Sequence, residues 1–241
     1  MDDCKNDLII CVPLKNNSKQ INKKINDTQQ KINKLLHEKY ELYPDILYNI
    51  LYSKNIDEFT DEEMNFVLEQ QKNVQINQCN SSSKNNFVLE EKEMKNIKDF
   101  CLKCVKEYFY DCFKVDDKTQ IHITQSWLNL NSKGEYANIH VHPNSIFSGV
   151  FYFNADPETD KLYFTSGKYL QITINPSHCD LLNSRTWWFP AETGKLLIFP
   201  SDLQHFVETV QTDEDRISLA FNVFIRGTIG AEHSLDMLVL Q

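Results

Sequence analysis

The spacing of apolar residues changes along the chain and divides it into two parts. In the first part, apolar side chains recur at the period of an amphipathic helix, as from Ile21 to Leu36, where polar residues fill the opposite face. After residue 117 apolar and polar residues alternate, which is typical of half-buried β-strands. The pattern predicts a mostly helical N-terminal part over 1–116 and a β-rich core over 117–228.

Short signals in the N-terminal part predict where its elements begin. Residues 7–14 form an apolar run interrupted by a proline, which indicates a brief strand. Pro44 suits the first turn of a helix whose apolar positions continue to Leu51. Thr60 and Glu63 fit a capping box, in which two side chains satisfy free backbone N–H groups, so another helix is expected to begin there.

The rest of the N-terminal part contains a polar stretch and a long helix. Asparagine and serine are frequent over residues 74–88, and this composition predicts a mobile polar surface loop. The following apolar stripe predicts a helix over 91–114, and Cys101 and Cys104 both lie on it. A zinc or redox role for this pair would need further ligands or an accessible thiolate, so packing in the core is favoured.

The C-terminal part contains eight strand-like runs with turn residues between them. They lie at about 119–131, 135–142, 146–154, 160–165, 169–174, 195–199, 203–210 and 215–226. Short strands without interleaved helices predict an antiparallel sandwich or jelly roll, so the fold class is mainly β. Because an apolar sheet face needs a partner layer, the helical part is expected to cover one sheet. We expect a single domain over 1–241 that ends in a C-terminal tail over 229–241.

Composition narrows the class of protein and its partners. The 241 residues are 41% hydrophobic, which supplies a full core, and the net charge of −9 argues against nucleic acid as a partner. No apolar run reaches the length of a membrane span, and the first residues lack the pattern of a signal peptide. Seven cysteines at irregular spacing suit a reducing compartment. We therefore expect an intracellular, cytoplasmic protein without a membrane partner, and the oligomeric state stays open.

Three histidines in the β-rich part are candidate metal ligands. His140 and His142 are separated by one residue on a predicted strand, so their side chains point to the same side. His205 lies on another predicted strand. Imidazole nitrogen binds Fe, Zn, Cu and Ni, and three such groups on a rigid scaffold leave coordination positions open. The alternative is that these histidines are surface or hydrogen-bonded residues without a metal.

Arg216 begins a strand whose two faces differ. Arg216, Ser218 and Asn222 share one face, while large apolar residues occupy the other, so we expect the strand to be covered on both sides. A buried guanidinium needs an anion, because an unpaired buried charge is very costly. The candidates are a bound carboxylate, gripped by Arg216 with help from Ser218, or an ion pair with Asp202 or Glu208.

Other nearby side chains have two interpretations each. Asn129 shares a strand face with Trp127 and is either a solvated residue near a turn or a ligand contact. The aromatic segment 187–190 is either a loop that forms a platform or lid for a substrate or part of the core. Asp202 is the carboxylate nearest in sequence to His205 and is a candidate acceptor for a ligand imidazole.

Three motifs in this order resemble a known family. They are His-x-His-Pro-Asn-Ser-x-x-Ser-Gly-Val-x-Tyr at 140–152, Leu-Leu-Ile-Phe-Pro-Ser-x-x-x-His at 196–205 and Arg-Ile-Ser-x-x-Phe-Asn at 216–222. Together they resemble the 2-oxoglutarate and Fe(II)-dependent oxygenases, and more narrowly a branch whose motif begins with His-x-His-Pro. The resemblance covers about residues 125–228.

The resemblance implies a double-stranded β-helix, which is a jelly roll, flanked by helices and with Fe(II) at its mouth. His140 matches the first metal ligand of the family and His205 matches the distal ligand. His142 falls where most of the superfamily has Asp or Glu, so the ligand set departs from the usual two histidines and one carboxylate.

The resemblance also implies a cosubstrate and a reaction. The keto acid end of 2-oxoglutarate would chelate the iron and its far carboxylate would pair with Arg216, with Ser218 and Asn129 as further binding residues. The reaction would use O₂ to hydroxylate a C–H bond of an unidentified small-molecule or protein substrate, with release of succinate and CO₂. Such chemistry needs no side-chain acid or base, because the cofactor supplies the reactivity.

Two alternatives stay open on the sequence. One is a three-histidine, cupin-like dioxygenase or isomerase that does not use 2-oxoglutarate. The other is a non-enzymatic β-sandwich binding module in which the histidines are incidental and the helical part carries a partner surface. Metal content separates the binding module from both enzymes.

Overall fold

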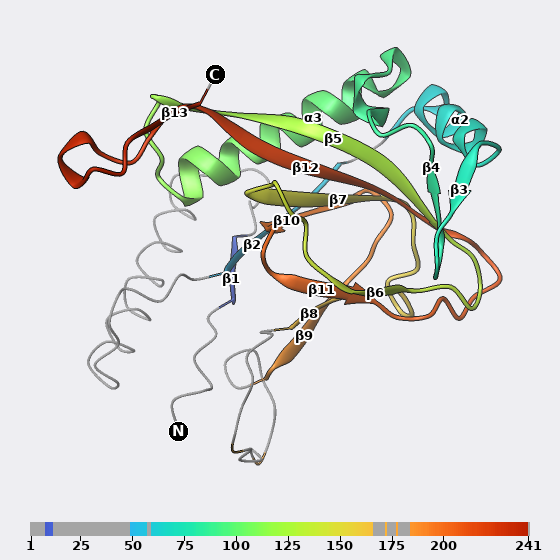
Figure 1. The fold of residues 1–241 in the computed structure, drawn as a ribbon. Coiled ribbons are helices and arrows are strands. Elements are labelled where there is room, and N and C mark those ends of the chain that lie inside the picture. Colours follow the sequence, from blue (N-terminus) through green and yellow to red (C-terminus); the bar gives the residue numbers. More distant parts are fainter. Residues whose placement is uncertain are drawn as a thin grey trace, which may run out of the picture.

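Two facing β-sheets form the centre of the molecule (Figure 1). The computed structural model describes residues 8–11, 49–56, 59–165, 172, 177 and 184–240. The larger sheet has the strand order β1-β2-β10-β7-β12-β5-β4-β3, with β13 also paired to β12, and the smaller sheet has the order β6-β11-β8-β9. This is the predicted jelly roll, and the pairs between the strands that the structure describes are antiparallel except for β1 with β2.

The elements have the following bounds. The larger sheet contains β1 (Leu8–Cys11), β2 (Asn49–Asn55), β3 (Val74–Ile76), β4 (Ser81–Ser83), β5 (Thr119–Asn131), β7 (Phe147–Asn154), β10 (Lys195–Pro200), β12 (Arg216–Ile229) and β13 (Leu238–Leu240). The smaller sheet contains β6 (Ala137–His140), β8 (Lys161–Thr165), β9 (Thr186–Pro190) and β11 (Gln204–Val207). The helices are α2 (Asp61–Gln70) and α3 (Lys95–Lys106), followed by a π-helical turn η4 (Glu107–Cys112), and short 3₁₀ turns are η2 (Val88–Glu90), η3 (Lys92–Met94) and η5 (Glu232–Ser234).

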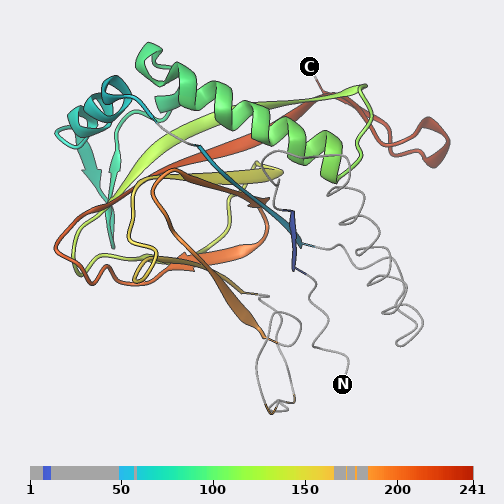
Figure 2. The ribbon, with the colours of Figure 1, turned by 180° about the vertical axis from the view of Figure 1, so that it is seen from behind.

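Helix α3 covers the outer face of the larger sheet, as Figures 1 and 2 show from opposite sides. Ile217, Leu219 and Phe221 of β12 join α3 in one apolar core. Cys101 and Cys104 are fully buried in that core, which supports packing as their role. The prediction that helical residues cover one sheet is therefore confirmed for α3. In the part of the chain that the structure describes, no helix is long and apolar enough to cross a bilayer.

A second apolar core lies between the two sheets. Strand β10 alternates, because Leu196 and Ile198 belong to the core under α3 while Leu197 and Phe199 belong to the core between the sheets. Tyr152 of β7 also belongs to the core between the sheets. The inner faces of the strands therefore enclose the space in which the candidate ligands lie.

The helix predicted from Pro44 to Leu51 is wrong in its last residues. Ile50 and Leu51 lie in β2, which pairs with β1 on one side and with β10 on the other. Ile50 and Leu51 pair with Ile9 and Ile10 of β1, while residues 52–55 of the same strand pair with β10. Such tertiary pairing overrides a local helical pattern. Residues 44–48, the helix predicted over 21–36 and most of the strand predicted over 169–174 lie outside the described residues.

The polar stretch 74–88 contains a short hairpin where the sequence predicts a loop. Strands β3 and β4 pair with each other, and β4 extends the larger sheet beside β5. Ser82 and Ser83 are buried, and their hydroxyls are satisfied by neighbours: the side-chain amide of Gln75 donates to Ser82 (3.0 Å) and the N–H of Leu128 donates to Ser83 (3.0 Å). The sheet edge thus provides partners for polar residues that the sequence alone places in solvent.

Two further strands occupy segments predicted as a loop and a tail. The aromatic segment 187–190 belongs to β9, where Phe189 is buried in the core between the sheets. Trp188 is more exposed and lies under the Lys161 ammonium, at 4.3 Å from the ring centre. Within the tail, β13 pairs with the end of β12. The partner of β9 is β8, more than 20 residues earlier in the chain, whereas β13 folds back on the strand directly before it.

Gly149 of β7 lies against the Phe221 ring of β12, and replacing it tests how closely these two strands pack. A Cβ atom at residue 149 would lie 2.1 Å from Cζ of the buried Phe221 ring. We expect Gly149→Ala to lower the free energy of unfolding by about 1–3 kcal/mol, measured by urea denaturation, because overpacking forces neighbours to shift. Gly149→Ala combined with Phe221→Leu should recover part of the loss. A single variant as stable as the unmodified chain would contradict this close approach.

Candidate metal centre

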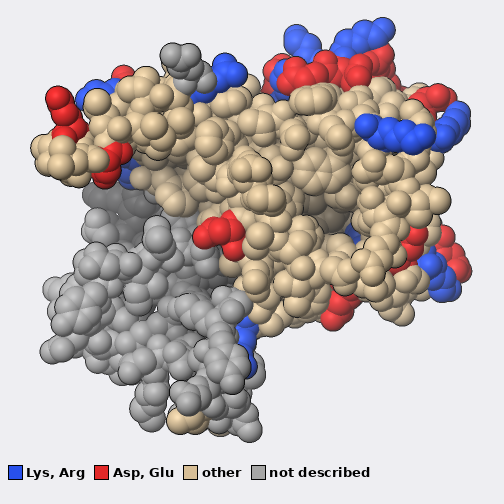
Figure 3. Space-filling view, viewed as in Figure 1, with Lys and Arg blue, Asp and Glu red and all other residues tan. Residues whose placement is uncertain are grey.

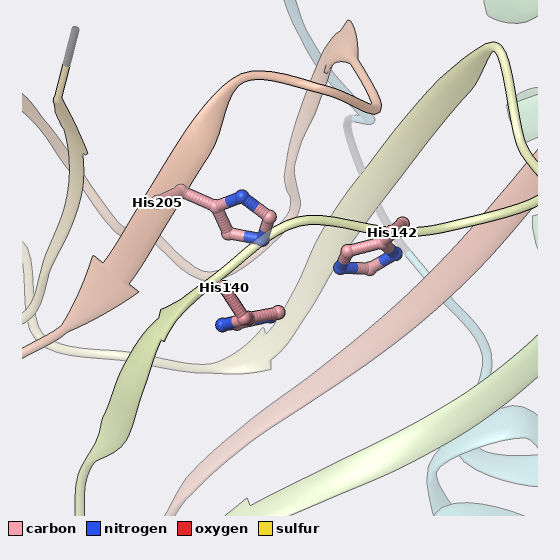
Figure 4. A group of neighbouring side chains, drawn as sticks. All are labelled: His140, His142 and His205. Carbon is pink, nitrogen blue, oxygen red and sulfur yellow. The ribbon is translucent and has the colours of Figure 1, made fainter. Parts of the chain in front are cut away.

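Three imidazoles come together at the end of the smaller sheet. His140 ends β6, His142 follows two residues later, and His205 lies in β11 directly opposite His140. Their candidate ligand atoms all lie within 4.8 Å of one another. Figure 4 shows the three rings gathered around a common space. The structure therefore assembles the three histidines that the sequence singles out.

Each imidazole is held through its Nδ1 atom, which leaves Nε2 available. The three Nδ1 atoms bond carbonyl oxygens: Asn138 O for His140 (2.7 Å), Leu203 O for His205 (2.9 Å) and Asn222 Oδ1 for His142 (2.7 Å). Because a carbonyl oxygen only accepts, each Nδ1 carries the proton and each Nε2 has a free lone pair. The second hydrogen bond of a metal-binding histidine orients the ring in this way.

Burial keeps two of these imidazoles neutral. His205 is 4% exposed, and burial lowers its pKa from 6.5 to about 3, with a smaller lowering from the neighbouring His140. Burial also lowers the pKa of His142, although the hydrogen bond that His142 donates to Asn222 opposes the shift. A metal ligand must be unprotonated. These rings are therefore ready to bind a metal at neutral pH.

The buried His205 predicts how stability depends on pH. Its pKa is about 3 in the folded chain and ordinarily 6.5, so the unfolded chain binds more protons between these values. The contribution is complete above pH 6.5 and is lost as the pH falls toward 3. Urea unfolding of chelator-treated protein should show lower stability at about pH 5 than at about pH 7.5, with a smaller difference in His205→Gln. If the stability difference between the two pH values is the same in the unmodified chain and in His205→Gln, the buried His205 imidazole is not the neutral group that we expect.

One cavity of about 300 Å³ joins the histidines to Arg216. Ser218, Asn129 and Tyr152 also line it, and they are neighbours in the sheet, since Ser218 is opposite Asn129 on β5 and opposite Tyr152 on β7. Figure 3 shows a hollow between the sheets with mostly uncharged side chains around it. The inward face predicted for β12 therefore forms the wall of this cavity.

Arg216 has a protein partner that the sequence analysis missed. Its Nη1 atom lies 2.9 Å from Oδ1 of Asp160, and both side chains are buried. The predicted partners are wrong: Asp202 is exposed, and Glu208 accepts a hydrogen bond from Tyr163. Asp160 comes just before β8, on the smaller sheet, and no spacing in the sequence brings it toward β12.

The second terminal nitrogen of Arg216 has no such partner. Nη2 is buried and makes no hydrogen bond to any residue that the structure describes. A buried donor without an acceptor costs about 1–3 kcal/mol. Because Arg216 lines the cavity, a carboxylate in the cavity could satisfy this donor.

Two more side chains give the cavity hydrogen-bonding groups. Burial raises the pKa of the Tyr152 phenol well above its ordinary value, so the group remains a proton donor at neutral pH. The indole N–H of Trp127 donates to Oδ1 of Asn129 (3.1 Å), which orients the carboxamide beside the cavity. The Trp127 ring also stacks on His142, with 5.6 Å between ring centres.

Sequence reasoning overlooked the groups behind the ligands. Leu203, not Asp202, provides the acceptor for His205, so the expectation for Asp202 is wrong. The sequence pattern predicts the inward face for Asn222 but no role in the site, and in the structure its Oδ1 atom accepts a hydrogen bond from His142. The turn between β3 and β4, residues 77–80, also lines the cavity. The one sequence signal for Asn222 is the strand alternation, which puts it on the same face as Arg216.

The motif-bearing segment matches a family of enzymes. Residues 125–222 match the family model described as "Putative 2OG-Fe(II) oxygenase". This segment is of the 2-oxoglutarate and Fe(II)-dependent oxygenase family. The matched segment runs from β5 into β12 and contains the three histidines and Arg216. The family match identifies this segment as part of an enzyme.

Solved structures have a fold similar to that of this chain. An oxidoreductase of the 2OG-Fe(II) oxygenase family from Burkholderia pseudomallei aligns with a TM-score of 0.50 at 10% identity, over 90% of this chain and 94% of that chain. HygX from Streptomyces hygroscopicus, with nickel, 2-oxoglutarate and hygromycin B bound, aligns at 0.50 and 11% identity, over 72% and 82%. The epimerase SnoN, in complex with Fe³⁺, α-ketoglutarate and nogalamycin RO, aligns at 0.52 and 11% identity, over 78% and 85%. The search of curated proteins finds no match to this sequence.

Proposed function

We propose that this chain is an oxygenase that uses Fe(II) and 2-oxoglutarate to hydroxylate a C–H bond of a small-molecule or protein substrate. One observation carries the proposal: three imidazoles with available Nε2 atoms and a buried Arg216, whose Nη2 has no partner among the described residues, line the same cavity. The family match and the ligands in HygX and SnoN support it.

The residues present fit a divalent iron ion. Imidazole nitrogen is a suitable ligand for iron, and the three rings are already oriented and close together. His140, His142 and His205 would hold the ion and leave positions for other ligands. The set is neutral, because His142 stands where a carboxylate is usual in such sites. An anionic cosubstrate would then be the main source of negative charge at the metal.

The residues around Arg216 fit the far carboxylate of 2-oxoglutarate. Arg216 would donate from Nη2, and Ser218 and Tyr152 would add hydroxyl donors from the neighbouring strands. Asn129 would contact the cosubstrate from β5. Asp160 would keep the guanidinium fixed, so that little ordering is needed when the anion binds.

The protein would position the reactants, while the cofactor supplies the chemistry. With iron bound, one atom of O₂ enters succinate as 2-oxoglutarate loses CO₂, and the other atom is inserted into the C–H bond of the substrate. The apolar walls of the cavity, including Leu162 and Phe199, would limit the access of water to this reaction.

Anaerobic titration of the Fe(II)-loaded protein with 2-oxoglutarate tests the proposal. Chelation of the metal by the keto acid should produce a visible metal-to-ligand charge-transfer band that saturates. Bound iron without a band would favour the three-histidine dioxygenase or isomerase, which binds its substrate directly. A protein that binds no iron would favour the non-enzymatic binding module.

A further inference from the structure

His142 is held differently from the other two candidate ligands. It lies beyond the end of β6, so sheet pairing does not fix its position. Instead, its main-chain N–H donates to the carbonyl oxygen of Ser201 (2.9 Å), and its ring Nδ1 donates to Oδ1 of Asn222 (2.7 Å). The position of this ring therefore depends on groups from β12 and from the turn after β10.

Buried serines fix the Asn222 carboxamide. Asn222 is 8% exposed, and the hydroxyl of Ser148 on β7 also donates to its Oδ1 atom (3.2 Å). Ser148 Oγ lies 2.8 Å from Ser201 Oγ, and Ser201 Oγ lies 2.8 Å from Ser145 Oγ, so the three hydroxyls form a connected group behind Asn222. Asn222 presents its Oδ1 atom to the His142 ring and to the Ser148 hydroxyl, and because this oxygen only accepts, the proton of His142 lies on Nδ1. Buried hydroxyls are costly unless bonded, so the chain of contacts holds as a unit.

Backbone features around Asn222 and after His142 also fix the positions of these two residues. The pairing of β12 with β5 has a bulge between Asn222 and Val223, and the Thr124 hydroxyl donates to the Asn222 carbonyl (3.2 Å). The segment after His142 is tied to the sheet, because the N–H of Ile146 donates to Val223 (2.9 Å). Asn144 within it has a left-handed backbone, with φ of 58°. Bulges next to active sites commonly redirect a side chain.

We propose that Asn222, held by the Ser148–Ser201–Ser145 chain, is the positioning residue that makes His142 a metal ligand in place of a carboxylate. This inference rests on the proposed function. All three acceptors behind the imidazoles are neutral carbonyl oxygens, so Asn222 orients His142 without adding negative charge to the site. A merely structural Asn222 would affect stability and leave the metal unchanged.

The experiment measures Co(II) binding and the visible d–d spectrum of the Co(II)-loaded full chain. Co(II) accepts the same imidazole ligands as Fe(II), and its spectrum reports coordination geometry. We expect Asn222→Leu to weaken Co(II) affinity by about 10–100-fold and to alter the spectrum, as losses of outer hydrogen-bond partners do. Asn222→Asp, which keeps the acceptor, should restore both. Ser148→Ala should have a smaller effect in the same direction.

Ser126→Ala is the matched control, because Ser126 is equally buried but bonds the N–H of Leu89, away from the histidines. It should lower stability without changing Co(II) affinity or the spectrum. An Asn222→Leu protein with affinity and spectrum like those of the unmodified chain would overturn the inference. If that variant does not fold, an unaltered Ser148→Ala would overturn it. An unmodified chain that binds no Co(II) would instead defeat the proposed function itself.

Discussion

His140→Ala is expected to abolish tight binding of Fe(II), and with it the charge-transfer band in the presence of 2-oxoglutarate. Loss of an outer partner alone costs about 10–100-fold in metal affinity, so loss of a ligand should cost more than about 100-fold. His140 is exposed, so its removal should leave the fold intact. Isothermal titration with Fe(II) under anaerobic conditions measures the loss.

A matched control separates the ligand from a general effect of losing a histidine. His233 is also exposed and lies in η5, outside the group of three imidazoles. We expect His233→Ala to bind Fe(II) like the unmodified chain. Equal Fe(II) affinity in His140→Ala and His233→Ala, with both proteins folded, would remove His140 from the metal centre.

The double variant Arg216→Gln with Asp160→Asn is expected to fold and bind Fe(II) but to lose affinity for 2-oxoglutarate. Hydrogen bonds to charged groups contribute about 1.5–3 kcal/mol, which corresponds to about 10–100-fold in affinity. The single variant Arg216→Ala is a poorer probe. It leaves the Asp160 carboxylate buried without its 2.9 Å partner, and such a loss costs about 3–5 kcal/mol of stability.

Asp160→Asn provides the opposite test, because it keeps Arg216 and removes the competing carboxylate. We expect this variant to bind 2-oxoglutarate at least as tightly as the unmodified chain, since the buried guanidinium then lacks the negative charge of Asp160 and Nη2 still needs an acceptor. The increase of the charge-transfer band with 2-oxoglutarate concentration measures both variants. If the double variant binds 2-oxoglutarate as tightly as the unmodified chain, Arg216 only forms a structural ion pair with Asp160 and does not bind the cosubstrate.

Much of the core was predictable because its signals are local. The alternation of Arg216, Ser218 and Asn222 with large apolar residues predicts the two faces of β12, and the structure confirms both faces. The Thr60 and Glu63 capping box is present at the start of α2. Each of these signals depends on residues within one turn or one strand, so distant parts of the chain do not change it.

The elements and contacts that the sequence did not predict depend on residues far apart in the chain. Strand β2 exists because β10 and β1 lie on its two sides, and the β3–β4 hairpin exists because β5 offers an edge. Asp160 meets Arg216 only because the two sheets face each other. Such contacts join residues far apart in sequence, and a local pattern contains no record of them.

For the candidate site, the sequence by itself determined the chemistry, and the tertiary structure decided the arrangement. His140, His142, His205 and Arg216 could be named from spacing and motif, because the ligand types and the strand period are properties of the local chain. Only the folded sheets show that Asp160 accepts a hydrogen bond from Nη1, one of the two terminal nitrogens of Arg216. They also show that Asn222 accepts a hydrogen bond from the His142 ring. A buried polar group takes the partner that packing brings to it, and packing is a property of the whole fold.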